Sequence, residues 1–424
     1  MNFPKLLFLL LSIYTIFCVS CKKDEDTSPP IITELAPNEN TSFNTFDSIS
    51  VQANLYDERE LTFVSVELLN ADLISVVTPY GKNLNGTDHF LNAQLIVDNI
   101  HIISGLHYIL ITAKDQQNTT RTYIKVHVNG IPFETKGYVS FESLGSGSEV
   151  HSYYGQSDTL LLQTESEIID GIVDSYYQQF GILKGPDGPF ESHPLYPFID
   201  GWDIESIHGG INYCRSQSDD LSIQIGFMDQ LLSFYEGEAS LKASFNSESN
   251  YSPYYSLKNG ENIIVWQKAP GQSSNRLEVF YPSGAIKQVT QYNHTIVGLE
   301  QKNNTSIFVI ANENTSAYFD IYNLETGVIE SQVFEDLIYY DSCLDPAGNL
   351  YISSSNGILK YSSTSFQFST FSALIASQIT WDEDQGVLVA AVGSQLKTLG
   401  PFGVELNSVA LNGECVELSV WYSK

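Results

Sequence analysis

The sequence of 424 residues predicts an all-β protein in two parts, a β-sandwich followed by a closed ring of repeated β-sheets. Two patterns predict this fold class. Residues 31 to about 130 alternate apolar and polar side chains in short runs, as half-buried strands require. Beyond them, an apolar strand preceded by a polar turn recurs at intervals of roughly 37 to 44 residues. The tripeptide Gly130, Ile131 and Pro132 ends the first pattern, so we place the domain boundary there.

The first part, residues 31–130, contains short alternating runs separated by turn residues. Residues 48–55 and 63–68 are two such runs, and residues 109–113 and 122–128 form a final hairpin. About 100 residues in roughly seven short strands match the size of a two-sheet sandwich. We therefore expect one face of each strand to be buried between two sheets.

The last part of this region resembles the closing strands of bacterial immunoglobulin-like domains. The resemblance covers residues 105–115 and 118–128. It implies that Tyr108 starts the penultimate strand and that Asp115 and Asn118 shape the turn after it. The cysteines and tryptophan of the antibody core are absent, so the resemblance concerns the fold alone.

The second part, residues 136–424, repeats one strand pattern. The repeated anchor strands begin within residues 220–223, 262–265, 306–309, 349–352 and 386–389. Counterpart strands with an apolar-x-apolar pattern follow three of them, at 277–280, 319–322 and 358–361. At about 42 residues per four-stranded repeat, the region gives a β-propeller of six or seven blades. Closure of the ring removes the exposed sheet edges that an open array would leave, and we expect residues 415–422 to pair with strands near 138–163.

Two segments carry a closer resemblance within these repeats. Residues 344–352 and 357–361 look like the repeat of propellers of the NHL and gluconolactonase-like type. Enzymes of the second type collect carboxylate and Asn ligands for a metal from several inner strands. The matching positions here hold Ile, Leu and Val, so the metal site of those enzymes does not carry over.

The charge balance excludes some classes of partner. The chain has 20 Lys and Arg against 50 Asp and Glu, a formal charge of −30. Binding to nucleic acid requires clustered basic residues for the phosphates, and a polybasic membrane patch requires the same. We therefore expect no nucleic-acid partner, and contact with a membrane only through a lipid.

The N-terminus predicts such a lipid. A lysine at position 5, an apolar run over residues 6–19 and the sequence Val19-Ser20-Cys21 form a signal peptide that resembles those of bacterial lipoproteins. That resemblance implies cleavage after residue 20 and lipidation of Cys21, with residues 21–30 as a tether. The alternative is an ordinary cleaved signal peptide. Residues 21–25 look like the export tag of surface lipoproteins of the Bacteroidetes, which favours display at the cell surface over the periplasmic face of the outer membrane.

Residues 165–207 are the least regular part of the predicted ring and are rich in aromatic side chains. Exposed aromatic rings on loops can stack on sugars or anchor a protein partner. The candidate ligand-binding residues are Tyr176, Tyr177, Phe190, Tyr196 and Trp202. The alternative is a degenerate blade whose aromatic rings fill gaps between neighbouring blades.

The sequence shows no strong catalytic motif and predicts no cofactor. A weak metal candidate is the cluster Asp203, Glu205 and His208, in which the two carboxylates share one face of a predicted strand. The pair Asp382 and Asp384 coincides with a repeat turn, which we interpret as structural.

The cysteines that remain after Cys21 are few and widely spaced. Cys214, Cys343 and Cys415 are odd in number and form no metal-binding spacing. They are buried thiols, or two of them form one long-range disulfide.

These observations predict an envelope lipoprotein in which an immunoglobulin-like spacer carries a β-propeller. We expect the propeller to bind a carbohydrate or another exported protein without catalysis. One alternative is a polysaccharide-processing hydrolase or lyase with its site at the mouth of the ring. Another is a structural subunit of an envelope assembly. Neither the ligand nor the exact number of blades follows from the sequence.

Overall fold

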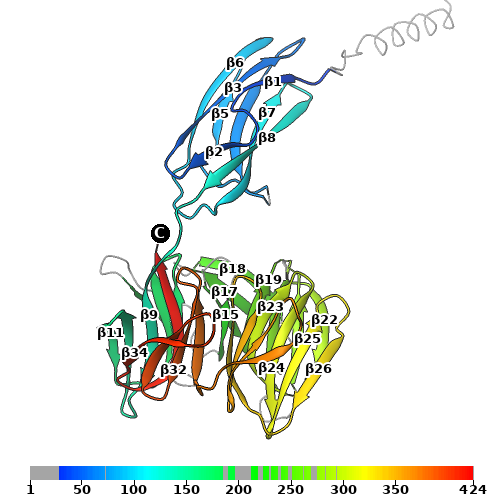
Figure 1. Ribbon diagram of the computed structural model, residues 1–424. Coiled ribbons are helices and arrows are strands. Elements are labelled where there is room, and N and C mark those ends of the chain that lie inside the picture. The colour runs from blue at the N-terminus through cyan, green and yellow to red at the C-terminus, as the bar shows by residue number, and fades with distance from the viewer. Residues whose placement is uncertain are drawn as a thin grey trace, which may run out of the picture. The chain divides into compact units, whose positions relative to one another are not determined.

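The computed structural model describes residues 28–71, 73–184, 190–195, 212–217, 223–228, 231–236, 240–246, 251–260, 262–268, 275–281, 283–292 and 294–423. These residues form strands and turns, and no helix occurs among them (Figure 1). The chain is therefore all-β, as the sequence predicts. Within the same residues there is no helix of the length and apolarity that crossing a membrane would need. The described chain falls into two compact units, one ending at Pro132 and one running from Phe133 to Ser423.

The first unit is a sandwich of two sheets. Its strands are β1 (Ile31–Ala36), β2 (Thr41–Asn44), β3 (Ser48–Tyr56), β4 (Phe63–Leu69), β5 (Tyr80–Asn83), β6 (Asp88–Ile96), β7 (Gly105–Lys114) and β8 (Thr119–Asn129). One sheet has the order β1-β3-β6 and the other β2-β8-β7-β4-β5. The predicted runs at 48–55, 63–68, 109–113 and 122–128 all lie within strands of these sheets.

One hydrophobic core holds the two sheets of the sandwich together. In β3, Ile49, Val51, Ala53 and Leu55 are buried while the residues between them face outward. This alternation is the period of two that the sequence shows. The turn between β7 and β8 is closed by Asp115, whose carboxylate accepts hydrogen bonds from the backbone N–H groups of Gln117 and Asn118. The predicted role of Asp115 in this turn is confirmed.

The second unit consists of sheets whose strands mostly follow one another in the chain, except that the C-terminal strand joins the sheet of the first three strands. Its early strands are β9 (Glu134–Ser143), β10 (Ser148–Tyr154), β11 (Ser157–Thr164), β12 (Ile168–Asp174), β13 (Gln179–Lys184), β14 (Phe190–Pro194), β15 (Asn212–Gln217), β16 (Ile223–Met228), β17 (Leu231–Glu236), β18 (Ser240–Asn246), β19 (Ser252–Asn259), β20 (Asn262–Lys268), β21 (Asn275–Phe280) and β22 (Ile286–Gln291). Strands β15 to β22 form one sheet of order β18-β17-β16-β15-β19-β20-β21-β22. Its two halves meet where β15 and β19 pair in parallel.

The later strands of this unit form three regular four-stranded sheets. They are β23 (Thr295–Asn303), β24 (Ser306–Glu313), β25 (Ser316–Asn323), β26 (Ile329–Phe334), β27 (Tyr339–Leu344), β28 (Leu350–Ser354), β29 (Gly357–Tyr361), β30 (Phe368–Ser372), β31 (Gln378–Asp382), β32 (Val387–Val392), β33 (Gln395–Leu399) and β34 (Glu405–Ala410). Each sheet keeps its strands in chain order. The predicted anchor strands at 262, 306, 349 and 386 correspond to β20, β24, β28 and β32, the second strand of each repeat.

The sheets are arranged as a propeller-like ring (Figure 1). Strands β19, β23, β27, β31 and β35 (Glu414–Ser423) contact one another in this order, so each is the inner strand of its sheet. Strand β35 then contacts β12, which continues the ring. Apolar side chains fill the spaces between neighbouring sheets; for example, Phe308, Phe319 and Tyr361 of β24, β25 and β29 pack together.

The C-terminal strand closes the ring. Strand β35 pairs antiparallel with β9, and Ser423 lies opposite Glu134, so the predicted pairing of residues 415–422 is confirmed. The buried carboxylate of Asp382 supports this closure, because it accepts hydrogen bonds from the hydroxyls of Thr135 at 2.7 Å and Tyr138 at 3.0 Å. Burial, together with the charge of Asp382, raises the pKa of Tyr138. Asp382 also accepts the backbone N–H of Gln385, so it forms the predicted turn as well.

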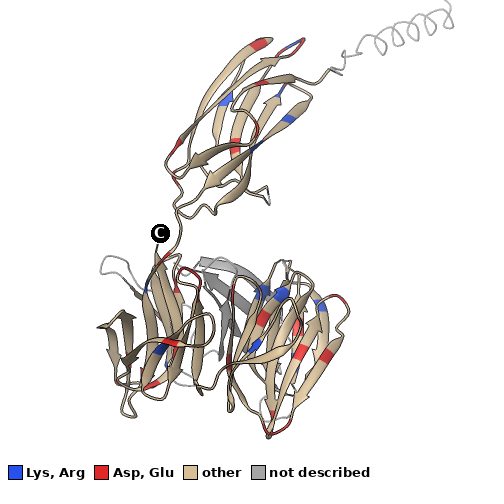
Figure 2. Cartoon of the chain, viewed as in Figure 1, with Lys and Arg blue, Asp and Glu red and all other residues tan. Residues whose placement is uncertain are grey.

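The acidic residues are not gathered in one patch. Figure 2 shows Asp and Glu distributed over the strands and turns of both units of the described chain. Such a distribution favours solubility and weakens association with anionic surfaces.

Candidate functional site

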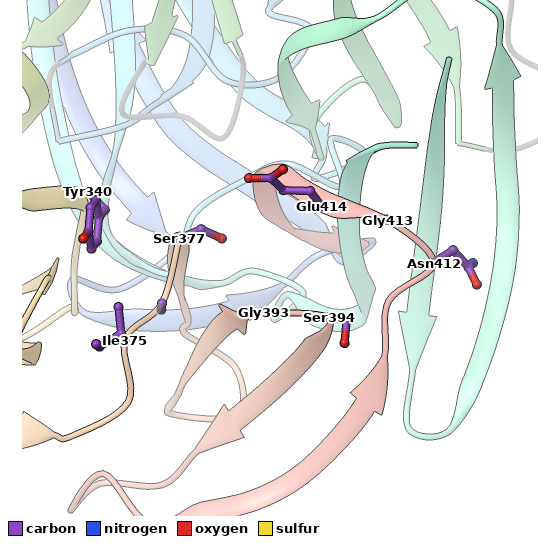
Figure 3. Close-up of a pocket in the computed structure, with 9 residues that line it drawn as sticks. Tyr340, Ile375, Ser377, Gly393, Ser394, Asn412, Gly413 and Glu414 are labelled. Carbon is purple, nitrogen blue, oxygen red and sulfur yellow. The ribbon is translucent and has the colours of Figure 1, made fainter. Parts of the chain in front are cut away.

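A pocket of about 610 Å³ opens in the second unit, at the end of the ring where inner strands begin. Four separate segments line it: the start of β27, the loop before β31, the turn between β32 and β33, and the turn between β34 and β35. Figure 3 shows Tyr340 and Ile375 on one side of the pocket and Asn412 and Gly413 on the other. The volume lies within the range of sites for small ligands.

The lining combines a few apolar side chains with small polar groups. Tyr340 and Ile375 are 42% and 52% exposed, so both present apolar surface to solvent. Ser377, Ser394 and Asn412 add hydroxyl and amide groups, Gly393 and Gly413 bring backbone close to the space, and Ala376 completes the lining beside Glu414. Glu414 is the only charged residue of this lining.

Hydrogen bonds between side chains of one sheet and backbone groups of the next hold these segments in place. The amide of Asn312 bonds both backbone groups of Tyr339, accepting from its N–H at 2.9 Å and donating to its C=O at 2.8 Å. This fixes the start of β27, where Tyr340 lies. The carboxylate of Asp341 accepts the backbone N–H of Ile379 at 2.7 Å, which ties the start of β31 to β27. Two walls of the pocket are therefore held by hydrogen bonds between neighbouring sheets, at a point where the register of β27 against β28 shifts between Tyr339 and Asp341.

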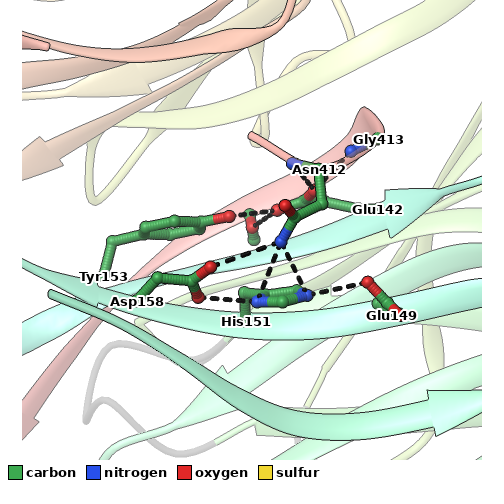
Figure 4. Close-up of polar contacts among 8 residues, drawn as sticks. Glu142, Glu149, His151, Tyr153, Asp158, Asn412 and Gly413 are labelled. Atoms are coloured by element: carbon green, nitrogen blue, oxygen red, sulfur yellow. Dashed lines mark hydrogen bonds and ion pairs between the residues drawn. The ribbon is translucent and has the colours of Figure 1, made fainter. Parts of the chain in front are cut away.

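The third wall is the closing turn, residues 411–413, which joins β34 to β35. It is held by the carboxylate of Glu142, a fully buried residue of β9. One oxygen of Glu142 accepts the backbone N–H groups of Asn412 and Gly413, each at 2.7 Å (Figure 4). The other accepts the hydroxyls of Ser140 at 2.5 Å and Tyr153 at 2.8 Å. A single carboxylate thus fastens the closing turn to strands some 270 residues earlier in the chain.

A histidine adjoins this carboxylate network. His151 lies between two acidic side chains, with its Nδ1 at 2.6 Å from Asp158 and its Nε2 at 3.0 Å from Glu149. The side-chain amide of Asn412 lies 3.3 Å from both Asp158 Oδ2 and His151 Nε2 (Figure 4). Burial alone would lower the pKa of His151, but the hydrogen bonds to Glu149 and Asp158 outweigh burial and raise it. The two carboxylates therefore extend the imidazolium form of His151 to higher pH.

The aromatic residues predicted as ligand contacts lie elsewhere. Tyr176 and Tyr177 sit in the turn between β12 and β13, half-buried, with their rings 4.8 Å apart. Phe190 begins β14 and is 3% exposed, and its ring covers the backbone of Gly181. Tyr196 and Trp202 lie outside the described residues. The structure does not bring the described members of this set to the pocket, and their binding role stays a prediction.

The structure does not describe the predicted lipidation site or the predicted metal cluster. Cys21 lies outside the described residues, as do Asp203, Glu205 and His208. In the part of the chain that is described, no cluster of three or more His, Cys, Asp or Glu side chains is placed to hold a metal ion.

The structure describes the side chains of two of the three remaining cysteines. Cys343 and Cys415 are both free, so neither forms the alternative disulfide. Burial raises the pKa of each thiol, which keeps both protonated and unreactive. The side chain of Cys214 is not among those described.

No sequence pattern marks the pocket. Asn412 and Gly413 form an ordinary polar turn in the sequence, and Glu142 is one acidic residue among many. A buried acidic residue within an apolar strand was the one available signal, since Glu142 follows Val139 and Phe141 in β9.

No family model matches the sequence, and neither does any curated protein. Several solved structures are similar to this chain at low identity. One is the extracellular domain of a putative one-component system of Bacteroides thetaiotaomicron, with 15% identity, a TM-score of 0.40, and coverage of 62% of this chain and 39% of that one. A quinonprotein alcohol dehydrogenase-like protein of the same species has 11% identity and a TM-score of 0.44, with 92% of this chain and 96% of that one covered. A protein of unknown function from Desulfotomaculum acetoxidans has 10% identity and a TM-score of 0.48, with 68% and 99% covered. The chain thus spans well under half of the first of these, and no function passes to it from any of them.

Proposed function

We propose that the protein is an envelope lipoprotein whose immunoglobulin-like unit carries a seven-bladed β-propeller, and that the pocket of the propeller binds a neutral carbohydrate without catalysis. Residues 1–20 act as the signal peptide, Cys21 carries the lipid, and residues 21–30 form the tether. Residues 31–130 are the spacer and residues 136–424 the propeller. The lipoprotein sequence at Val19-Ser20-Cys21 supports the anchor.

The order of the inner strands supports seven blades. Strands β12, β23, β27, β31 and β35 each lie at the edge of a separate sheet, and the eight-stranded sheet divides into two antiparallel halves of four strands where β15 and β19 pair in parallel. The two-sheet order of the first unit, three strands against five, supports an immunoglobulin-like sandwich.

The lining of the pocket is the observation that carries the proposed ligand. Exposed Tyr340 offers a ring for the apolar face of a sugar, while Ser377, Ser394 and Asn412 offer hydroxyl and amide groups for its hydroxyls. A volume of about 610 Å³ suits a small sugar unit better than the broad surface of a protein partner. With Glu414 as the only charged lining residue, a neutral ligand fits better than an acidic one.

The position of the pocket within the second unit is consistent with ligand capture. The chain enters this unit at β9, whose first residue Glu134 lies opposite Ser423, the last residue of β35. The pocket lies at the other end of β35, beside its first residue Glu414. Ten residues of extended strand separate these ends by about 30 Å. The pocket therefore opens on the ring face opposite to the entry of the chain.

Binding is favoured over glycoside hydrolysis by the same lining. Hydrolysis of a glycosidic bond usually requires two carboxylic acids on either side of the bond. The pocket lining contributes one, Glu414. The carboxylates of Glu142, Glu149 and Asp158 nearby are held by hydrogen bonds to the closing turn and to His151.

A pair of tyrosine variants tests the proposed site. Tyr340→Ala removes the exposed ring of the pocket, and Tyr281→Ala removes a ring of similar exposure, 45%, from a turn outside it. We expect the full-length protein to bind at least one neutral glycan on an array, and Tyr340→Ala to weaken that binding about tenfold in calorimetry, a loss of about 1.4 kcal/mol. Tyr281→Ala should bind as the wild type does. Equal losses in the two variants, or no neutral glycan bound, would refute the site.

The anchor has its own test. In cells, Cys21→Ala should move the protein from the membrane fraction to the soluble fraction, because no lipid can be attached. Protease treatment of intact cells should then degrade the wild type if it is displayed at the surface. A Cys21→Ala protein that stays in the membrane fraction would contradict the lipid anchor.

A further inference from the structure

The first unit has an outer sheet face that the proposed function does not use. We define the amide face as the outward side chains of β3 and β6 at Ser50, Gln52, Asn54, Asn92 and Gln94. The strand register places Ser50 opposite Gln94 and Gln52 opposite Asn92. The intervening residues of both strands point into the core. The amide groups therefore form a continuous patch on one side of the sandwich.

The amides of this patch are available to a ligand. Gln94 accepts a hydrogen bond from the hydroxyl of Ser48 at 2.5 Å. Within the described chain, the side chains of Gln52, Asn54 and Asn92 make no hydrogen bond. Each amide both donates and accepts, so the patch presents a dense array of both kinds of group.

Apolar rings flank the amide face at one end. Tyr56 is 44% exposed and lies opposite Ile31 of β1, and Phe90 is 54% exposed and lies opposite Asn54. The outward positions of β3 run from Ser48 to Tyr56, which is about 27 Å of extended strand. The face is therefore long enough for an extended chain of several sugar rings, with flat aromatic surface at one end.

The face is nearly uncharged in a very acidic chain. Of the outward positions of β3 and β6, only Asp88, at the strand end, carries a charge. The opposite sheet of the same unit differs, since its outward positions on β7 and β8 include Lys114, Arg121 and Lys125. Neutrality is thus a property of this face and not of the unit.

These features select one class of ligand. A basic protein would find one carboxylate along the outward positions of β3 and β6, that of Asp88 at the strand end. An apolar protein surface would bury the amides without partners, which is unfavourable. Nucleic acid is repelled by a chain of charge −30. A neutral polysaccharide matches both the amides, through its hydroxyls, and the rings, through the apolar faces of its sugars. We propose that the β3–β6 face is a second binding site, for an extended neutral polysaccharide, independent of the propeller pocket.

Affinity electrophoresis of the full-length protein tests this site. The probes are xylan, glucomannan and mixed-linkage β-glucan as neutral polymers, and polygalacturonate as an acidic one. Tyr56→Ala removes a ring from the face, and Tyr123→Ala removes an equally exposed ring, also 44%, from the opposite sheet. Asn92→Asp keeps the shape of the amide face and adds a charge. Circular dichroism confirms that each variant is folded.

We expect retardation by at least one neutral polymer and none by polygalacturonate. Tyr56→Ala and Asn92→Asp should each weaken the retardation about tenfold, while Tyr123→Ala should not. A loss confined to Tyr340→Ala would leave the propeller pocket as the site and overturn the second one. A loss confined to the face variants would support the second site and count against the pocket. The inference is overturned if no neutral polymer retards the wild type, or if Tyr123→Ala and Tyr56→Ala lose equally.

Discussion

Replacing Glu142 should both destabilise the propeller and loosen the pocket. Its buried carboxylate accepts four hydrogen bonds, from the hydroxyls of Ser140 and Tyr153 and from the backbone N–H groups of Asn412 and Gly413. Glu142→Leu preserves the approximate volume but removes every acceptor. Each buried hydroxyl left without a partner costs about 1–3 kcal/mol. The two backbone groups lie in a turn that is partly exposed, so water can replace their partner.

One effect of the substitution reduces the expected loss of stability. Removing a carboxylate from the core relieves its desolvation cost, which offsets part of the loss. We therefore expect Glu142→Leu to lower the free energy of unfolding by about 3 kcal/mol. Glu142→Gln should lower it by only about 1 kcal/mol, because the amide oxygen can still accept from the closing turn while its NH₂ group donates to the two hydroxyls.

Urea unfolding followed by tryptophan fluorescence measures this difference. All four tryptophans lie within residues 133–424, so their fluorescence reports on the propeller and not on the sandwich. Hydrogen exchange provides a second readout, since the amides of Asn412 and Gly413 should exchange faster in Glu142→Leu. A Glu142→Leu protein within about 0.5 kcal/mol of the wild type, or a Glu142→Gln protein that is the less stable of the two, would contradict this role of Glu142.

Two further predictions concern His151 in β10 and Gly171 in β12. The raised pKa of His151 means that its pairing with Glu149 and Asp158 stabilises the fold fully below the unfolded-state value of 6.5 and is lost as pH rises through the folded-state value. The stability difference between wild type and His151→Gln, from urea midpoints, should therefore shrink between mildly acidic and alkaline pH; a constant difference would contradict this. Gly171→Ala would place a Cβ 2.3 Å from the ring of Phe141 and should cost about 1–3 kcal/mol in thermal or urea unfolding. The double variant with Phe141→Leu should recover part of that loss, and simple additivity of the two changes would argue against the clash.

Much of the architecture follows from local sequence patterns. The period of two in residues 48–55 matches the buried and exposed sides of β3. The recurring anchor strands at 262, 306, 349 and 386 match the second strands of successive sheets. Both patterns are local, because the alternation of buried residues and the repeat length can each be recognised within some 45 residues of sequence. The pairing of residues 415–422 was predictable for a different reason, since a ring needs a final strand to close it.

The pocket could not be predicted in this way. Its lining comes from four separate segments whose sequences carry no distinctive motif, and only ring closure places Asn412 across the pocket from Tyr340. The carboxylate of Glu142 reaches the closing turn across 270 residues, and no spacing rule links the two positions. The aromatic residues chosen from the sequence illustrate the same limit, because composition alone does not separate Phe190, which fills the core, from Tyr340, which faces solvent.

By itself, the sequence determined the all-β class, the repeated strands, the closing strand and the acidity of the chain. Side-chain periodicity and repeat length are local properties, so they can be recognised in the sequence without knowledge of the fold. The tertiary structure alone decided which segments surround the pocket, which carboxylate holds the closing turn, and which sandwich face is nearly uncharged. Those features depend on contacts between strands far apart in the chain, which exist only once the sheets have packed and the ring has closed.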